Sequence, residues 1–169
     1  MKLVIYNRLA HRSHRTTQHI GLRDGQTTST LYRYIDLPGK YSELEILVLD
    51  FVKFSPVLRV FVIYRPPHYD VKAVSYVRLL TECLNSYQSN KKNVHLIVGD
   101  LNLPYVNWNV FTGPSDDINS IILNFVIDNG YNQLVNFETR SSNLLDVLLT
   151  DTDTLITSLT ASPPISNSE

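Results

Sequence analysis

The sequence is poor in cysteine and has no long apolar run. Cys83 is the only cysteine among 169 residues, which excludes an internal disulfide and a zinc site built on paired cysteines. The first apolar stretch, residues 3–6, is followed at once by Asn7 and Arg8 and is too short for a signal-peptide core or a membrane span. We therefore expect an intracellular protein that is neither secreted nor inserted into a membrane.

Neither sign of charge dominates, but the charges are unevenly distributed along the chain. Residues 1–40 carry seven Lys/Arg and two Asp/Glu, whereas residues 91–169 carry three and nine. The basic start could lie against phosphates or could be an ordinary solvated loop. The acidic end has the more specific implication, because carboxylates bind hard cations.

Apolar periodicity predicts the order of the secondary structure. Strands are expected at residues 2–7, 44–51, 58–64, 94–98, 144–149 and roughly 155–159. Helices are expected after Asp70 and from Ser115-Asp116-Asp117, any of which could cap the second helix. Residues 44–51 and 58–64 are expected to pair as an antiparallel hairpin, while residues 8–29 show no apolar period and predict a loop. This order predicts an α/β fold, a layered α/β sandwich in which mixed sheets are flanked by helices.

Gly99-Asp100-Leu101-Asn102 follows directly on one of these predicted strands. Side chains two residues apart can point the same way, so Asp100 and Asn102 could act on one small target. An ionised Asp can take a proton from water, and a nearby Asn can hold that water or a phosphate oxygen. By itself the motif is also compatible with a simple turn, because Asp and Asn are common turn formers.

Three further strings accompany this motif: Tyr64-Arg65-Pro66-Pro67 before it, Leu103-Pro104 with Asn107-Trp108 just after it, and Asn143 to Leu149 downstream. In this order and spacing the sequence resembles the endonuclease/exonuclease/phosphatase superfamily. Trp108 and the pair Thr139-Arg140 resemble the branch carried by non-LTR (LINE-type) retrotransposons in particular. The resemblance runs from Lys2 to Pro164.

The resemblance implies a phosphodiester hydrolase that uses Mg2+ to cut DNA, in the nucleus or cytoplasm, beside other parts of a retrotransposon polyprotein. By position, Asp100 resembles the base that activates water and is also a weak metal ligand, while Asn102 resembles the residue that orients water and phosphate. Tyr64 resembles the phenol that contacts the scissile phosphate, although it could simply end a strand. Asp146 resembles the carboxylate that orients a catalytic histidine, and a carboxylate within an apolar run must be paired or ligated.

Two arginines are candidates for binding the substrate. Arg65 follows Tyr64 in the first string, and Arg140 could contact phosphate, although a surface ion pair would explain Arg140 equally well. The five histidines are expected to be structural or surface residues, and Asp151 and Asp153 are expected to form only a solvated turn.

Two motifs of the family have no counterpart in this sequence. The family's principal metal ligand, a Glu on an early strand, is not found before the segment that resembles Lys2 to Asn7, and Glu43 and Glu45 are expected to face solvent instead. A terminal Ser-Asp-His is also not found. We therefore expect a partial domain over residues 1–160, truncated at both ends and incomplete as a sandwich, a frayed Ser/Pro tail at 161–169, and weak activity or none.

Three alternatives remain open. The chain could be a non-catalytic remnant or pseudoenzyme that binds nucleic acid through its basic loop, or a decayed reading frame. It could be a phosphatase or phospholipase of the same superfamily, although Trp108 and Thr139-Arg140 favour the retrotransposon branch. It could also be a piece of a larger polyprotein whose flanking segments supply the absent motifs.

Overall fold

A computed structural model of the chain describes residues 2–4, 21–23, 32–88, 93–140, 143–152, 156 and 158–160. Contacts divide the chain into two compact units, residues 1–29 with 154–169 and residues 30–153. In the first unit, β1 (Lys2–Val4) pairs antiparallel with β2 (Gly21–Arg23) and parallel with β9 (Ser158–Thr160). The pattern of the sequence predicts β1 and, approximately, β9, but not β2. The tail at 161–169 and His11, His14 and His19 lie outside the described residues.

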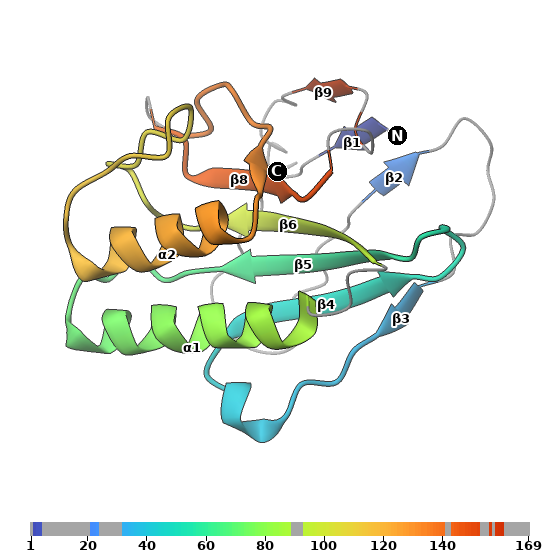
Figure 1. Cartoon of the computed structure of the whole chain (residues 1–169), viewed down its shortest axis with the longest axis horizontal. Helices are drawn as coiled ribbons and strands as arrows, with labels where there is room; N and C mark the ends of the chain where they lie inside the picture. Colours follow the sequence, from blue (N-terminus) through green and yellow to red (C-terminus); the bar gives the residue numbers. More distant parts are fainter. Residues whose placement is uncertain are drawn as a thin grey trace, which may run out of the picture. The chain divides into compact units, whose positions relative to one another are not determined.

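The second unit is built on a mixed six-stranded sheet in the order β3-β4-β5-β6-β8-β7 (Figure 1). Its strands are β3 (Tyr32–Tyr34), β4 (Glu45–Phe51), β5 (Leu58–Tyr64), β6 (Val94–Asp100), β8 (Asp146–Thr150) and β7 (Asn132–Gln133). The predicted hairpin of β4 and β5 is confirmed, and β5 pairs parallel with β6, which pairs antiparallel with β8. The very short strands β3 and β7 are not evident in the sequence.

Two helices lie against this sheet, α1 (Val71–Gln88) and α2 (Asp117–Asp128), in the positions that the periodicity predicts. The carboxylates of Asp70 and Asp116 accept backbone N–H groups in the first turns of α1 and α2, at 2.9 Å and 2.8 Å. Gly130, which has a φ of +66°, follows the end of α2 as expected of a C-terminal glycine. A 3-10 helix, Gly39–Tyr41, precedes β4. None of the described helices combines the length and apolarity needed to span a membrane.

Both faces of the sheet are buried. Phe61, Ile63, Ile97, Val147 and Leu149 share one core with the inner sides of α1 and α2, and that core includes Cys83. Because side chains alternate along a strand, the neighbouring residues point to the opposite face. There Val60, Val62, Leu96, Val98 and Leu148 form a second set of buried side chains. The arrangement confirms the predicted α/β class, with helices layered on a mixed sheet.

Candidate active site

Three of the predicted site residues are direct neighbours across the sheet. Tyr64 at the end of β5 is in register with Asp100 at the end of β6, and Asp100 is in register with Asp146 at the start of β8. Paired residues on adjacent strands point to the same face, with Cβ atoms roughly 5 Å apart. We call Tyr64, Asp100 and Asp146 the carboxylate row.

The carboxylate row lies on the face of the sheet opposite α1 and α2. Ile63 and Val147, which belong to the helix-covered core, each alternate with a member of the row. Asp100 is 3% exposed and Asp146 is 7% exposed, whereas Tyr64 is half-buried. Two acidic side chains are therefore held next to each other with little access to bulk water.

This placement raises the pKa of the Asp100 carboxyl above its usual value. Burial is the main cause, and the nearby charge of Asp146 adds to it, while the backbone N–H of Asn102 and the guanidinium groups of Arg140 and Arg65 act in the opposite direction. Asp100 Oδ1 accepts the Asn102 N–H at 2.9 Å. Asp100 Oδ2 is buried and accepts no hydrogen bond from the residues that the structure describes.

Gly99 lets β6 approach β5 closely just before Asp100. Its φ is +144°, and a Cβ at this position would lie 1.8 Å from the carbonyl oxygen of Ile63. Any other residue here would force the two strands apart. The glycine of the motif thus has a steric role in setting the register of Tyr64 and Asp100.

Asn102 lies beside Asp100 and is 6% exposed. Its φ is +48°, which is uncommon for a residue other than glycine. The side-chain amide donates to the carbonyl oxygen of Arg65 at 2.6 Å. The structure therefore brings Asn102 to the carboxylate row, as the motif predicts, with a fixed amide orientation.

Arg140 is positioned by its backbone pairing with Asn143, which precedes β8. Arg140 and Asn143 form an isolated antiparallel bridge, and the hydroxyl of Thr139 accepts the N–H groups of Leu145 and Asp146 at 3.0 Å and 3.1 Å. Arg140 Nη2 lies 3.5 Å from Asp100 Oδ2, and the Arg140 side chain is 47% exposed. Arg140 thus forms a loose ion pair within the site and faces solvent, and Thr139 anchors the start of β8, a role that its sequence motif does not reveal.

Arg65 is placed differently from the expected substrate ligand. It is 1% exposed, and its guanidinium donates to the backbone carbonyls of Leu101, His68 and Asn102. Burial lowers the pKa of Arg65, although the neighbouring Tyr69 and Asp100 favour its charged form. A guanidinium engaged in this way is not directed at a phosphate in solvent.

The pKa of Tyr64 is raised, mainly by burial and then by the charges of Asp100 and Glu45, whereas Arg140 and Arg65 lower it. The phenol therefore stays protonated over the physiological range and can act as a hydrogen-bond donor. Glu45 is the partner of Tyr64 on β4 and is exposed, as expected, as is Glu43.

Of the histidines that the structure describes, one is exposed and one is buried. His68 is exposed, as expected. His95 is buried, and its backbone N–H and its Nδ1 contact the two carboxylate oxygens of Asp151 at 2.9 Å and 2.6 Å. Asp151 is exposed, as a solvated turn implies, but its carboxylate is also bonded to His95, which that expectation did not include. Asp153 lies outside the described residues.

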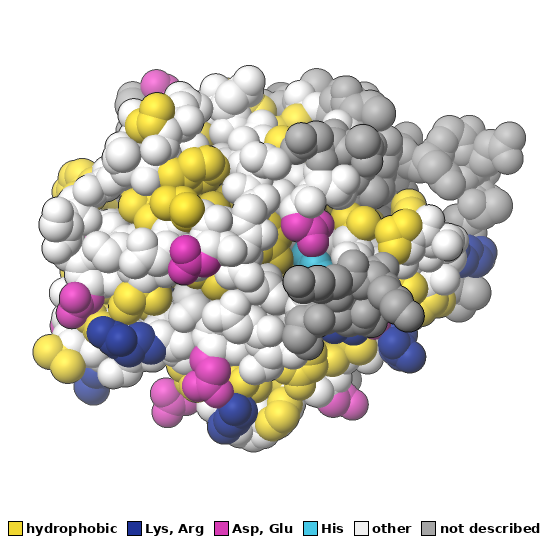
Figure 2. Space-filling model, viewed as in Figure 1, with side chains coloured by type: hydrophobic (Ala, Val, Ile, Leu, Met, Phe, Trp, Pro, Cys, Tyr) yellow, Lys and Arg dark blue, Asp and Glu magenta, His cyan; other side chains and the backbone are white. Residues whose placement is uncertain are grey.

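A shallow groove between α1 and α2 is a weaker candidate for a ligand-binding site. It is lined by Arg78, Thr81, Glu82, Asn85, Ser86 and Ile121. Its hydroxyl groups donate to helix carbonyls, and Glu82 accepts hydrogen bonds from Lys40 and Tyr41. Basic and acidic side chains are interspersed over this face of the molecule (Figure 2). These satisfied groups and mixed charges give no chemical reason for a ligand.

Comparisons with known proteins agree with the resemblance seen in the sequence. A family described as endonuclease-reverse transcriptase matches residues 58–169, more than half of the chain. The fold is similar to a solved structure titled as the endonuclease domain of TRAS1, a telomere-specific non-LTR retrotransposon, with 15% identity and a TM-score of 0.47. That match covers 70% of this chain and 53% of the solved one, so the chain spans about half of its length. No curated protein matches the sequence significantly.

Proposed function

Because the chain belongs to the endonuclease-reverse transcriptase family, we propose that its carboxylate row hydrolyses phosphodiester bonds in DNA. The domain is of the retrotransposon endonuclease type, and the proposed reaction is the nicking of a target strand to prime reverse transcription. Other parts of a retrotransposon polyprotein are the proposed partners.

The observation that carries this proposal is the buried oxygen Asp100 Oδ2. It lies beside a second carboxylate, and Arg140 Nη2 lies 3.5 Å away in a loose ion pair. A buried carboxylate oxygen left in this state costs stability, so its presence is better explained by chemistry than by folding. A raised pKa also makes the Asp100 carboxylate a stronger base than an ordinary aspartate.

Each residue has a role in the proposed reaction. Asp100 accepts a proton from water as the water oxygen attacks phosphorus, and the phosphorus–oxygen bond to the leaving sugar oxygen breaks. That sugar oxygen then takes a proton from solvent. Asn102 orients the water, and the O–H of Tyr64 and the exposed guanidinium of Arg140 donate to the non-bridging phosphate oxygens, where negative charge develops.

Asp100 and Asp146 are the residues that would hold Mg2+. The unpartnered oxygen of Asp100 and the adjacent carboxylate fit this ion, which commonly binds one or two protein carboxylates together with substrate phosphate. When bound, the ion would neutralise charge on the phosphate. The described residues contain no group of three or more His, Cys, Asp or Glu side chains that could hold a metal. With two carboxylates as its protein ligands the ion would be bound weakly, and we propose that this chain by itself cleaves slowly.

Nicking of supercoiled plasmid tests the proposal. Purified protein is incubated with Mg2+ or with a chelator, alongside the variants Asp100→Asn and Asp36→Asn, the second of which changes an exposed aspartate far from the row in sequence. We expect slow nicking that the chelator abolishes, that Asp36→Asn retains, and that Asp100→Asn lowers by about 10²–10⁴.

Two results would contradict the proposal. Nicking that is equal in Asp100→Asn and the native chain would place the chemistry elsewhere. A folded protein that binds DNA in a salt-dependent manner and never nicks it would instead be a non-catalytic nucleic-acid-binding domain.

A further inference from the structure

Arg65 is the largest side chain that is completely buried in the described part of the chain. Its Nη1 and Nη2 donate to the carbonyl oxygens of His68 and Asn102, at 3.0 Å and 2.6 Å, and its Nε donates to that of Leu101. A buried charge is tolerated only when hydrogen bonds compensate for lost hydration. The bonds to Leu101 and Asn102 therefore commit the guanidinium to the backbone that follows Asp100, and the bond to His68 ties it to its own segment.

The segment after β5 and the segment after β6 are tied together in both directions. The N–H of Arg65 donates to the carbonyl of Asp100 at 2.8 Å, and the side-chain amide of Asn102 donates back to the carbonyl of Arg65. Tyr69 adds a further bond, because its hydroxyl donates to the carbonyl of Asn102 at 2.9 Å. The ring of Tyr69 also lies 5.2 Å from the Arg65 guanidinium carbon.

These contacts converge on a residue with an unfavourable backbone conformation. Asn102 has a φ of +48°, and such a conformation in a residue other than glycine persists only where the surroundings determine it. The Asn102 carbonyl receives donors from Arg65 and Tyr69. The same conformation directs the Asn102 N–H to Asp100 Oδ1 and so fixes how the carboxylate is turned.

We propose that Arg65 and Tyr69 are positioning residues that hold Asn102 in its left-handed conformation and thereby orient the Asp100 carboxylate. Neither acts as a phosphate ligand. The expected effect on cleavage rests on the proposed function, whereas the expected effect on the conformation of Asn102 does not.

The first experiment measures amide hydrogen exchange by NMR without DNA. The variant Tyr69→Phe removes a single hydroxyl, and Tyr105→Phe, an exposed tyrosine, is the matched control. We expect exchange of the Asn102 amide to become about tenfold faster in Tyr69→Phe, while the amide of Ile97 within β6 and all amides of Tyr105→Phe keep their native rates. Unchanged exchange at Asn102 would overturn the proposal.

Arg65 variants provide a second comparison in the same measurement. Arg65→Met removes all guanidinium bonds, Arg65→Lys keeps a charge and some donors, and Arg78→Met changes an exposed arginine of α1 as a control. We expect the Asn102 amide to exchange fastest in Arg65→Met, with partial rescue in Arg65→Lys. If Arg65→Met fails to fold, Tyr69→Phe decides the question.

The second experiment measures the kinetics of plasmid nicking. Substitution of Arg65 or Tyr69 should lower kcat and leave KM near its native value. The reason is that both side chains act on the geometry of Asp100 and Asn102 rather than on DNA affinity. A raised KM with native kcat and native exchange at Asn102 would show that Arg65 binds phosphate, and would overturn the proposal. If the native chain nicks no DNA, the proposed function fails. The exchange rates then still decide whether Arg65 and Tyr69 hold Asn102 in its conformation.

Discussion

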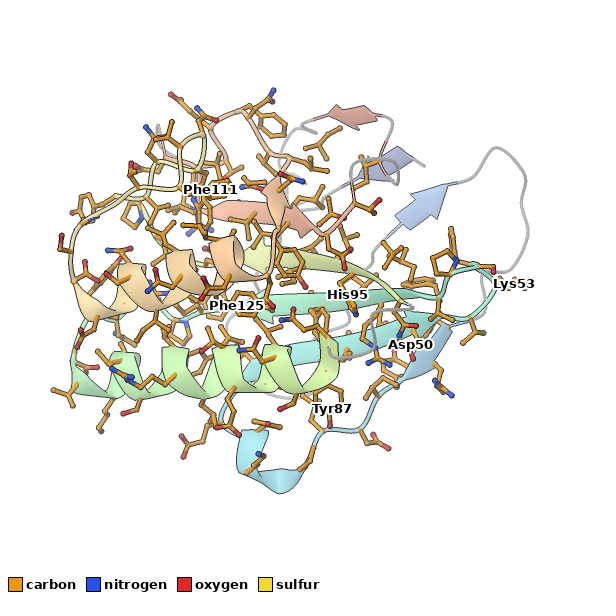
Figure 3. The ribbon with its side chains drawn as sticks, in the orientation of Figure 1. Asp50, Lys53, Tyr87, His95, Phe111 and Phe125 are labelled. Carbon is orange, nitrogen blue, oxygen red and sulfur yellow. The ribbon has the colours of Figure 1, made fainter. Side chains whose placement is uncertain are left out.

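Two rows of polar side chains cross the same sheet at opposite ends and on opposite faces. The carboxylate row lies at the end of β5 and β6. The other, which we call the charged row, consists of Arg33, Asp50, Arg59 and His95, in register on β3, β4, β5 and β6, with Asp151 bonded to His95. Figure 3 labels Asp50 and His95, together with Tyr87 near the end of α1.

The charged row is electrostatically satisfied. Asp50 is 1% exposed and accepts bonds from Arg59 at 2.6 Å and 2.9 Å and from Arg33 at 2.9 Å, while Arg59 also donates to the Tyr87 carbonyl at 2.6 Å. Burial alone would raise the pKa of Asp50, but these two arginines outweigh it and lower the pKa. Within the described residues, His95 Nε2 is the one buried polar atom of this row without a hydrogen bond.

The carboxylate row has the opposite character, because it places like charges side by side and leaves Asp100 Oδ2 without a hydrogen bond from the described residues. Alternating charges stabilise a strand array, whereas adjacent like charges destabilise it. The difference indicates that the charged row stabilises the fold, and it supports the proposal that the carboxylate row carries the chemistry.

The largest expected effect is on the charged row. Asp50→Ala leaves the largely buried guanidinium of Arg59 without its carboxylate partner, so we expect the free energy of unfolding to fall by about 3–5 kcal/mol. Urea denaturation measures this change, with Asp36→Ala as an exposed control. A loss under about 1 kcal/mol would show that the row contributes little to the fold.

The carboxylate row should respond in the opposite direction. Asp100→Asn removes a buried charge next to Asp146, so we expect the free energy of unfolding at neutral pH to rise by about 1 kcal/mol while nicking is lost. Because the folded-state pKa of Asp100 is raised, ionisation destabilises the native chain as pH rises through that value. The stability difference between Asp100→Asn and the native chain should therefore shrink at lower pH. Asp50 has a lowered pKa in the folded chain, so its ionised carboxylate stabilises the fold at pH values above its unfolded-state pKa. This stabilisation is lost as the pH falls through the folded-state pKa of Asp50. A destabilised Asp100→Asn would remove the contrast between the rows.

Two neighbours should move the pKa of Asp100 in opposite directions. Asp146→Asn removes a like charge and should lower this pKa, whereas Arg140→Met removes an opposite charge and should raise it. Carbon-13 NMR titration of the Asp100 carboxyl follows both changes without requiring activity. A pKa of Asp100 that stays at its native value in both variants would show that burial alone sets it.

The smallest effect is expected at the exposed end of the charged row. The Arg33 side chain is 67% exposed, and an exposed ion pair is screened by solvent. We expect Arg33→Gln to change the free energy of unfolding by less than about 1 kcal/mol in urea denaturation. A loss close to that of Asp50→Ala would show that Arg33, and not Arg59, is the principal partner of Asp50.

Local patterns in the sequence were sufficient for the longer elements. The β4–β5 hairpin, α1, β6, α2 and the strand at β8 all appear where periodicity places them, and the structure selects Asp116 among the three candidate caps of α2. Strands β3 and β7 have three and two residues, too few to produce a periodic signal, and they form because β4 and β8 offer them backbone partners.

The candidate site was predicted only in part. The sequence marks Tyr64, Asp100, Asn102, Asp146 and Arg140, because their spacing matches a family pattern. It gives no indication that Arg65 points inward, that Tyr69 contacts the Asn102 carbonyl, or that Asp151 meets His95. Each of these contacts joins residues far apart in the chain, and each depends on the register of a strand pair.

The sequence by itself determined the types of the main elements and the family, because apolar period, caps and motif spacing are local properties of the chain. Only the tertiary structure decided which charges meet. A shift of one residue in the pairing of β6 with β8 would move Asp146 to the other face and separate it from Asp100. Strand register, set by packing over the whole sheet, is what makes one row of side chains an alternating ion network and the other a pair of adjacent carboxylates.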